Sequence, residues 1–225
     1  MPADAPVRRD RRAERHAATK TEIVDAAWRL ADEHGLTGWS LRDVADIVGI
    51  RQPSLYVYFD SKNALYDAMF AAGYQDMLEQ IAATEVDPDP VRMLHRAARV
   101  FLDFAVERPA RYYLLFLRPI PGFEPSPESY QLALASLESL REVLATVGVR
   151  DGAHVDLFTA LMSGLATQQV SNDPGGDRWS RLLDAGVDMF LVATGVQPQR
   201  RDAKSSTGPP QPRRRQSNRK GRADS

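Results

Sequence analysis

The stretch LRDVADIVGIRQPSLYVYFDSK, residues 41–62, constrains the fold of this chain more than any other segment. Ser40 precedes it and Asp43 follows three residues later, a variant of the capping box that begins helices. Gly49 permits the backbone conformation with which many helices end. The apolar residues between these two signals recur at the i, i+3, i+4 and i+7 spacing of one helical face: Leu41, Val44, Ala45 and Val48. We therefore expect a helix of about two turns that ends in a tight turn.

A second short helix is expected directly after this turn. Pro53 fits only the first turn of a helix, which places the helix start near Gln52. Leu55 and Phe59 then form one apolar face. The remaining side chains of this helix point elsewhere: Ser54, Tyr56 and Tyr58. Two helices around a glycine turn, the second with a polar and aromatic outer face, predict a helix-turn-helix that reads the major groove of DNA.

The overall charge of -1 conceals a strong segregation of charge along the chain. Residues 1–20 carry a net charge of +3 and residues 199–225 a net charge of +7, whereas residues 21–65 and 66–198 carry -3 and -8. Basic ends therefore flank an acidic body. Affinity for phosphate depends on the local charge of the DNA-facing surface, so the acidic isoelectric point does not exclude a nucleic-acid partner. The absence of cysteine excludes disulfides, thiolate metal sites and cysteine nucleophiles.

Helical periodicity dominates the rest of the chain, so we expect an all-α fold. Outside the motif, helices are expected over residues 19–34, 62–84, 90–107, 109–118, 127–147, 151–172 and 178–195. Four segments are expected: a flexible basic arm (1–18), a helix-turn-helix domain (19–78, with the motif at about 41–60), a helical regulatory and dimerisation domain (79–196) and a disordered basic tail (197–225). The break Asp87-Pro88-Asp89-Pro90 separates the helices of the two domains. The sequence shows no membrane-spanning stretch and no apolar signal core, which predicts a cytoplasmic location.

The first third of the chain resembles the TetR family of bacterial transcriptional regulators. The resemblance lies in the pattern I-x-x-A-A-x-x-L from Ile23, the helix from Leu41 to Gly49, and the run SLYVYF-D-SK that ends at Lys62 and is followed by Leu65. It covers about residues 19–78, and the remaining chain matches through its length and helical pattern. The resemblance implies a three-helix DNA-binding domain joined to a larger helical domain that dimerises and binds effectors. It further implies a homodimeric repressor that a small-molecule effector releases from a palindromic operator in double-stranded DNA.

Seven side chains of the motif are candidates for DNA contacts: Arg42, Arg51, Gln52, Ser54, Tyr56, Tyr58 and Lys62. Arg42 is suited to a phosphate or a guanine edge, and Gln52 is suited to adenine. Tyr56 and Tyr58 are two residues apart, so they cannot share one helical face. We expect Tyr58 to donate to a phosphate and Tyr56 to combine core packing with a DNA contact. Lys62 begins the next helix, where a cation opposes the helix dipole unless an anion such as a DNA phosphate lies nearby. The alternatives are a solvated surface arginine for Arg42, ordinary turn polarity for Arg51, Gln52 and Ser54, and a core position for one of the two tyrosines.

The second domain offers candidates for an effector cavity and for a dimer interface. By resemblance, its last two helices, which carry Leu157 and Leu161 on one and Leu182 and Phe190 on the other, would form a four-helix bundle with a second copy. Core packing within one chain explains the same residues without a partner. Six side chains are candidates for the wall of an effector cavity, although aromatic residues at helical spacing are more often plain core: Phe101, Phe104, Tyr112, Tyr113, Phe116 and Met162.

No pattern of a catalytic, metal or cofactor site is found in the sequence. The four histidines are scattered, and neither H-E-x-x-H, nor a glycine-rich phosphate loop, nor G-x-S-x-G occurs. We therefore do not expect an enzyme, a metal or a cofactor. Two alternatives stay open beside the regulator: a helical small-molecule binding protein with a non-functional DNA module, and a nucleic-acid packaging protein that binds through its basic ends.

Overall fold

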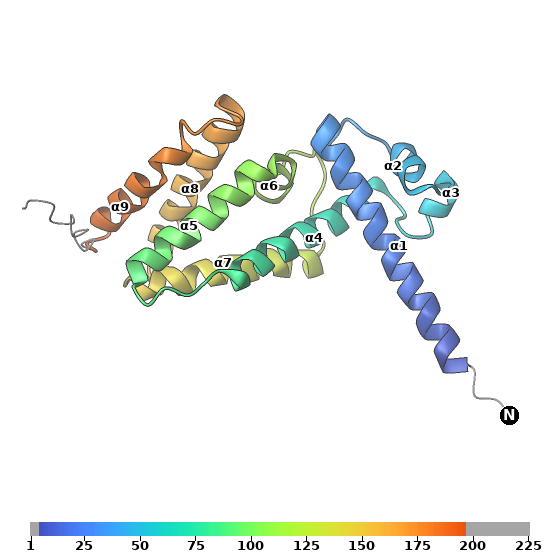
Figure 1. Cartoon of the computed structure of the whole chain (residues 1–225), viewed down its shortest axis with the longest axis horizontal. Coiled ribbons are helices and arrows are strands. Elements are labelled where there is room, and N and C mark those ends of the chain that lie inside the picture. The colour runs from blue at the N-terminus through green and yellow to red at the C-terminus, as the bar shows by residue number, and fades with distance from the viewer. Residues whose placement is uncertain (1–4, 197–225) are drawn as a thin grey trace, which may run out of the picture.

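The computed structural model describes residues 5–196 of the chain, with side chains described from residue 11 onward. Within this range the elements are α1 (Ala5–His34), α2 (Leu41–Val48), α3 (Gln52–Leu55), α4 (Lys62–Ala83), α5 (Pro90–Glu107), α6 (Pro109–Phe116), α7 (Pro127–Thr146), α8 (Gly152–Asn172), the short 3-10 helix η1 (Ser180–Leu182) and α9 (Leu183–Ala193). Figure 1 shows α1, α2 and α3 at one end of the molecule and α5 to α9 at the other, with α4 running between them. The described residues form helices and no strand, which confirms the all-α prediction.

The helices begin where the sequence supplies acceptors for the free amides of a first turn. Each such side chain contributes about 1 kcal/mol to helix stability. Five helices have a side chain of this kind at their N-cap: Ser40, Ser61, Asp89, Ser126 and Asp151. Because these signals are local, the predicted bounds of α2, α4, α5, α7 and α8 agree with the structure to within about two residues, which is the usual uncertainty of helix ends.

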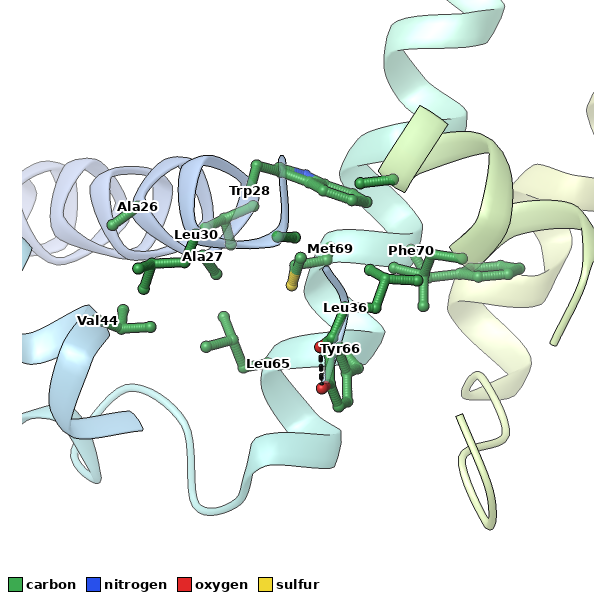
Figure 2. Packing of buried hydrophobic residues seen from close by; sticks show 14 of the residues in the cluster. Ala26, Ala27, Trp28, Leu30, Leu36, Val44, Leu65, Tyr66, Met69 and Phe70 are labelled. Carbon is green, nitrogen blue, oxygen red and sulfur yellow. Dashed lines mark hydrogen bonds between the residues drawn. The ribbon is translucent and has the colours of Figure 1, made fainter. Parts of the chain in front are cut away.

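The first hydrophobic core joins α1, α2, α3 and α4, as Figure 2 shows in part. Ala27 of α1, Val44 of α2 and Leu65 of α4 are each 0% exposed, and they meet at the centre of this core. The Tyr66 hydroxyl donates a hydrogen bond of 2.6 Å to the Leu36 carbonyl oxygen in the connection after α1. This core therefore holds the two motif helices on a scaffold made of α1 and α4.

The same core continues along α4 into the second half of the molecule. Phe104, Leu115 and Ile120 belong to it although they lie in or after α5 and α6. Gly73 of α4 permits this packing, because a Cβ atom there would lie 3.2 Å from the Leu115 side chain. The break expected at residues 87–90 falls between α4 and α5, yet α4 itself packs against both halves. A displacement of α4 would therefore be felt at both ends of the molecule.

A second core joins α5, α8 and α9 with part of α6 and α7. Its one fully buried amide, Gln169, accepts hydrogen bonds from the backbone of Trp179 (2.8 Å) and Ser180 (3.0 Å), which fixes the connection from α8 to η1. His95 of α5 lies between two carboxylates of α9, with Nδ1 3.3 Å from Asp184 and Nε2 2.9 Å from Asp188. These polar contacts fix the last helix against α5.

The structure corrects the prediction for the N-terminal arm. α1 begins at Ala5, not near residue 19, so the expectation of a flexible arm over residues 1–18 is wrong for residues 5–18, which are helical. The predicted disordered tail, residues 197–225, lies outside the described residues, as do residues 1–4. None of the helices in the described part of the chain has both the length and the apolar content needed to cross a membrane.

Candidate nucleic-acid interface and effector cavity

The turn between α2 and α3 has the geometry that the sequence predicts. Ser40 Oγ accepts from the Asp43 amide at 3.3 Å, and the Asp43 carboxylate accepts from the Ser40 amide at 2.8 Å. The Ser40 hydroxyl also donates to Asp43 Oδ2 at 2.8 Å, and the hydrogen bonds that the Ser40 hydroxyl and amide donate to this carboxylate lower the pKa of Asp43. Gly49 ends α2 with φ at 76°, and the amide of Ile50 donates to the Ala45 carbonyl at 3.0 Å. The reciprocal cap and the left-handed glycine fix the direction in which the chain enters α3.

α3 presents a polar leading end on an apolar base. Leu55 is 0% exposed and Phe59 is 5% exposed, so these two side chains fix the helix on the core as predicted. Arg51 occupies the N-cap without a side-chain cap hydrogen bond, which leaves its guanidinium available for another partner. Gln52 and Ser54 are exposed beside it. The leading end of α3 thus offers the guanidinium of Arg51, the side-chain amide of Gln52 and the hydroxyl of Ser54 to a ligand outside the molecule.

The two tyrosines of the motif differ in their surroundings. Tyr56 is 48% exposed. Tyr58 is half-buried and stacks on the ring of His16 in α1, with 4.7 Å between the ring centroids. The sequence could not distinguish them in this way, because His16 lies far from the motif along the chain. Tyr56 is the more accessible of the two, whereas Tyr58 also fixes the motif against α1.

Lys62 lies closer to the protein interior than the sequence predicts. Its Nζ atom donates to the Trp39 carbonyl oxygen at 2.5 Å and lies 4.1 Å from the centroid of the Trp39 ring. The centroid of the Tyr66 ring lies 5.3 Å from the same Nζ atom. Burial lowers the pKa of Lys62, and the charge of Asp43 partly opposes that shift. Lys62 therefore ties the start of α4 to the segment before α2, a role that no local sequence signal reveals.

The remaining exposed cations lie on α2 and α1. Arg42 is exposed in the first turn of α2, next to Asp43. Arg11, Arg12 and Arg15 are exposed on the N-terminal half of α1, which projects past α2 and α3 in Figure 1. The motif and the N-terminal half of α1, called the α1 extension below, thus carry basic side chains at the end of the molecule farthest from α8 and α9.

A cavity of about 420 Å³ lies in the other half, between α4, α5, α7 and α8. Three of the six predicted cavity residues, Phe101, Phe116 and Met162, line it. The other three do not line this cavity. Phe104 is 1% exposed in the first core. The remaining two hold α6 against α8, with the Tyr112 hydroxyl 2.8 Å from Thr167 Oγ1 and the Tyr113 hydroxyl 3.4 Å from Ser171 Oγ.

Much of the cavity wall that the sequence does not indicate comes from α4 and α7. Tyr74 and Met77 of α4 and Leu134, Leu137 and Leu140 of α7 line it. Burial, with a smaller effect of the nearby Tyr130, raises the pKa of Tyr74, so this hydroxyl is neutral in the wall. The leucines recur at i, i+3 and i+6, a spacing that indicates an apolar face but does not distinguish a cavity from solid core.

The last two helices leave an apolar face uncovered. Leu157 of α8 is 50% exposed, and Met189 and Val192 of α9 are 63% and 64% exposed. Leu182, directly before α9, is 41% exposed, whereas Phe190 is buried in the second core. Of the side chains expected in a dimer interface, the structure thus leaves Leu157 and Leu182 accessible and assigns Phe190 to the core. Exposed apolar side chains gathered on two helices are typical of an interface with another protein.

Two family models match the chain in succession. The model described as "Bacterial regulatory proteins, tetR family" matches residues 23–69, and the model described as "Tetracyclin repressor-like, C-terminal domain" matches residues 94–190. The first match contains the turn between α2 and α3, and the second contains most of α5 and all of α6, α7 and α8.

Curated relatives agree with these models. The HTH-type transcriptional regulator Rv1816 of Mycobacterium tuberculosis is 28% identical over 157 residues, which cover 67% of this chain and 59% of that protein. The chain therefore spans about 59% of the length of this regulator. The tetracycline repressor protein class A of Escherichia coli is 26% identical over 178 residues, which cover 75% of this chain and 79% of that protein.

Solved structures show the same fold at low sequence identity. A tetR-family transcriptional regulator from Streptomyces coelicolor has a TM-score of 0.65 at 18% identity, covering 80% of this chain and 82% of that one. A TetR protein from Acinetobacter baumannii in complex with minocycline has a TM-score of 0.56 at 20% identity, covering 77% and 94%. With both domain models, the relatives and the fold in agreement, this chain belongs to the TetR family of bacterial transcriptional regulators.

Proposed function

We propose that this protein is a sequence-specific DNA-binding repressor that acts as a homodimer and releases its operator when a small molecule occupies the cavity. The observation that carries the proposal is the polar leading end of α3, where Arg51, Gln52 and Ser54 are exposed while Leu55 is fully buried. A recognition helix must combine these properties, because its outer face contacts base edges while its inner face holds it at a fixed angle.

The exposed side chains divide into base readers and phosphate contacts. Arg51 is suited to the O6 and N7 atoms of guanine and Gln52 to adenine, each through two hydrogen bonds. Arg42 and Tyr56 are suited to phosphate oxygens on either side of the groove. Tyr58 and Lys62 act mainly by position, because their contacts with His16 and Trp39 fix α3 and the start of α4. The arginines of the α1 extension add contacts that carry no sequence information.

A second copy would meet this chain through the apolar face of α8 and α9. Leu157, Met189 and Val192 are exposed there, and covering them would remove apolar surface from water. The two recognition helices of a symmetric dimer then reach half-sites about 34 Å apart, one turn of DNA, or a multiple of that distance. Such a dimer reads a site with two-fold symmetry.

The cavity and the DNA-binding end share α4. Met77 and Ile81 of α4 line the cavity, and Leu65 and Met69 of the same helix lie in the core beneath α2. A ligand that needs a wider cavity therefore acts on the helix that supports the motif. A coupling free energy of about 1–3 kcal/mol would weaken operator binding by about 5–150-fold.

Selection of bound duplexes from a random-sequence pool tests this proposal. We expect the enriched sequences to share a two-fold symmetric motif, and the double variant Arg51→Ala, Gln52→Ala to enrich none. Enrichment of an asymmetric motif would contradict the dimer. Retention of duplexes without any shared motif would instead support non-specific binding through the basic ends.

A further inference from the structure

The two charged residues that line the cavity indicate the chemical class of its ligand. We propose that the ligand is an elongated amphipathic carboxylic acid, whose carboxylate binds the Arg118 guanidinium while its hydrocarbon body occupies the cavity. The inference rests on the proposed function for the role of the cavity, but its test is a direct binding measurement without DNA.

The cavity extends along much of α7. α7 lines it from Tyr130 to Val143, which corresponds to about 20 Å along the helix axis. A flexible hydrocarbon chain can follow a cavity of this length while it stays in contact with the apolar side chains of α5 and α7.

Charged side chains are scarce in its wall and lie at opposite ends. Arg118 follows α6 and shares the first end with Tyr130 in the first turn of α7. Asp156 in α8 shares the other end with Val143, close to where α7 passes into α8. Every other side chain that lines the cavity is apolar or neutral, including Phe101, Leu137 and Met162. The wall therefore favours a ligand with a largely apolar body and a charged group at one end.

The backbone of Arg118 identifies the end at which the charged group of the ligand binds. Its φ of 46° is the one positive φ among the non-glycine residues in the described part of the chain. It occupies the position after the C-cap of α6, where glycine is the usual residue because a side chain is disfavoured in the left-handed region. The presence of an arginine at a disfavoured backbone position is explained if its side chain has a binding role.

Arg118 is also available to a ligand. Its side chain is exposed at the cavity wall, and no carboxylate within residues 11–196 lies at ion-pair distance from it. An arginine binds a carboxylate through two parallel hydrogen bonds, which would orient the headgroup at this end. Tyr130 lines the same cavity, is 45% exposed and carries a hydroxyl that can donate a hydrogen bond to the same ligand.

Asp156 provides the competing possibility, a cationic ligand bound from the opposite end. It differs from Arg118 in its backbone, because it lies inside α8 with ordinary helical geometry and has no comparable strain. An aspartate in an exposed helical position needs no ligand to explain it. Comparing the affinities of a carboxylic acid and an amine of the same chain length therefore distinguishes an anionic ligand from a cationic one.

Isothermal titration calorimetry with dodecanoate, dodecylamine and dodecanol, each kept below its micelle concentration, tests the proposal on the full-length protein. We expect dodecanoate to bind at least tenfold more tightly than the amine and the alcohol. Arg118→Gln should weaken dodecanoate binding about tenfold, whereas Asp156→Asn should not weaken it. Arg150→Gln, an exposed arginine outside the cavity wall, is the matched control and should change nothing.

Two further variants separate binding from folding. Arg118→Gly removes the guanidinium and relieves the backbone, so it should lose the same affinity while unfolding at a temperature no lower than the wild type. Ala97→Phe fills part of the cavity and should abolish dodecanoate binding in a protein that still melts cooperatively. Tighter binding of the amine, or unchanged dodecanoate affinity in Arg118→Gln, would overturn the proposal. Binding of the bulky acid cholate with no binding of dodecanoate would refute the single-chain shape.

The result is independent of the DNA proposal. Specific DNA binding together with failure of dodecanoate to bind would refute the ligand class and leave the repressor intact. Dodecanoate binding that depends on Arg118 but leaves a specific protein–DNA complex undisturbed would support the ligand class and refute release by that ligand.

Discussion

Substitution of Gly49 by alanine tests whether the turn between α2 and α3 controls DNA binding. Gly49 has φ at 76°, and a Cβ atom built on it would meet nothing within 4 Å. The expected effect is therefore backbone strain alone, about 1–2 kcal/mol for an alanine in the left-handed region. The lower entropy of the unfolded chain offsets about 0.4–1 kcal/mol of this cost. The free energy of unfolding should fall by about 1 kcal/mol, which lowers Tm by about 2–4 °C for a chain of this size.

Gly148 offers a matched control at the other end of the molecule. It has φ at 86° and the same open surroundings, but it lies between α7 and α8. Gly148→Ala should therefore cost the same stability in urea unfolding. Only Gly49→Ala should also weaken specific DNA binding at a temperature where both variants are folded, because relief of its strain turns α3 relative to α2. Gly49→Asn, which tolerates this backbone region, should lose less of both.

Two outcomes would refute this reasoning. Unchanged stability of Gly49→Ala would show that the left-handed conformation carries no cost at this turn. Equal loss of DNA affinity in Gly49→Ala and Gly148→Ala would show that global stability, and not the direction of α3, limits binding.

The structure supports three further predictions. Tyr66→Phe should lower the free energy of unfolding by about 1–3 kcal/mol, because the buried Leu36 carbonyl loses its 2.6 Å hydrogen bond. Urea unfolding measures this loss, and an unchanged free energy would show that the hydrogen bond contributes nothing. Burial raises the pKa of Tyr66 to about 12, so the stability that the neutral hydroxyl contributes is complete below pH 10 and is lost as pH rises toward 12. Tyr66→Phe should therefore show a smaller fall of Tm between pH 10 and pH 12 than the wild type. An identical fall in both proteins would contradict this prediction. Met189→Glu, at a side chain 63% exposed on α9, should convert a dimer into folded monomers in light scattering, whereas Arg150→Glu should not.

The motif could be predicted from sequence because its signals are local. The capping pair Ser40 and Asp43, the glycine at the turn and the proline of α3 each act within a few residues, and the structure reproduces their geometry. The wall of the cavity could be predicted only in part, since Tyr112 points to α8 and Phe104 into the core although both carry the same aromatic pattern as Phe101. Helical spacing identifies an apolar face but not the element that covers it.

Contacts between distant residues were beyond sequence reasoning. Lys62 lies 23 residues from Trp39 along the chain, so its hydrogen bond to the Trp39 carbonyl has no local signal. The stacking of Tyr58 on His16 is of the same kind. The helical extension of α1 was missed for a different reason, because its high charge indicates a solvated arm as readily as an exposed helix.

The central claim is that this protein recognises a particular DNA sequence, and fluorescence anisotropy tests it most directly. The protein would be titrated into labelled DNA from upstream of its own gene and into a scrambled duplex of the same length, both at one physiological salt concentration. A preference of about 10³-fold or more for the upstream duplex is the predicted result. Equal, salt-sensitive binding to both duplexes, repeated with every duplex enriched in the selection, would contradict the claim and leave only attraction between basic side chains and phosphate.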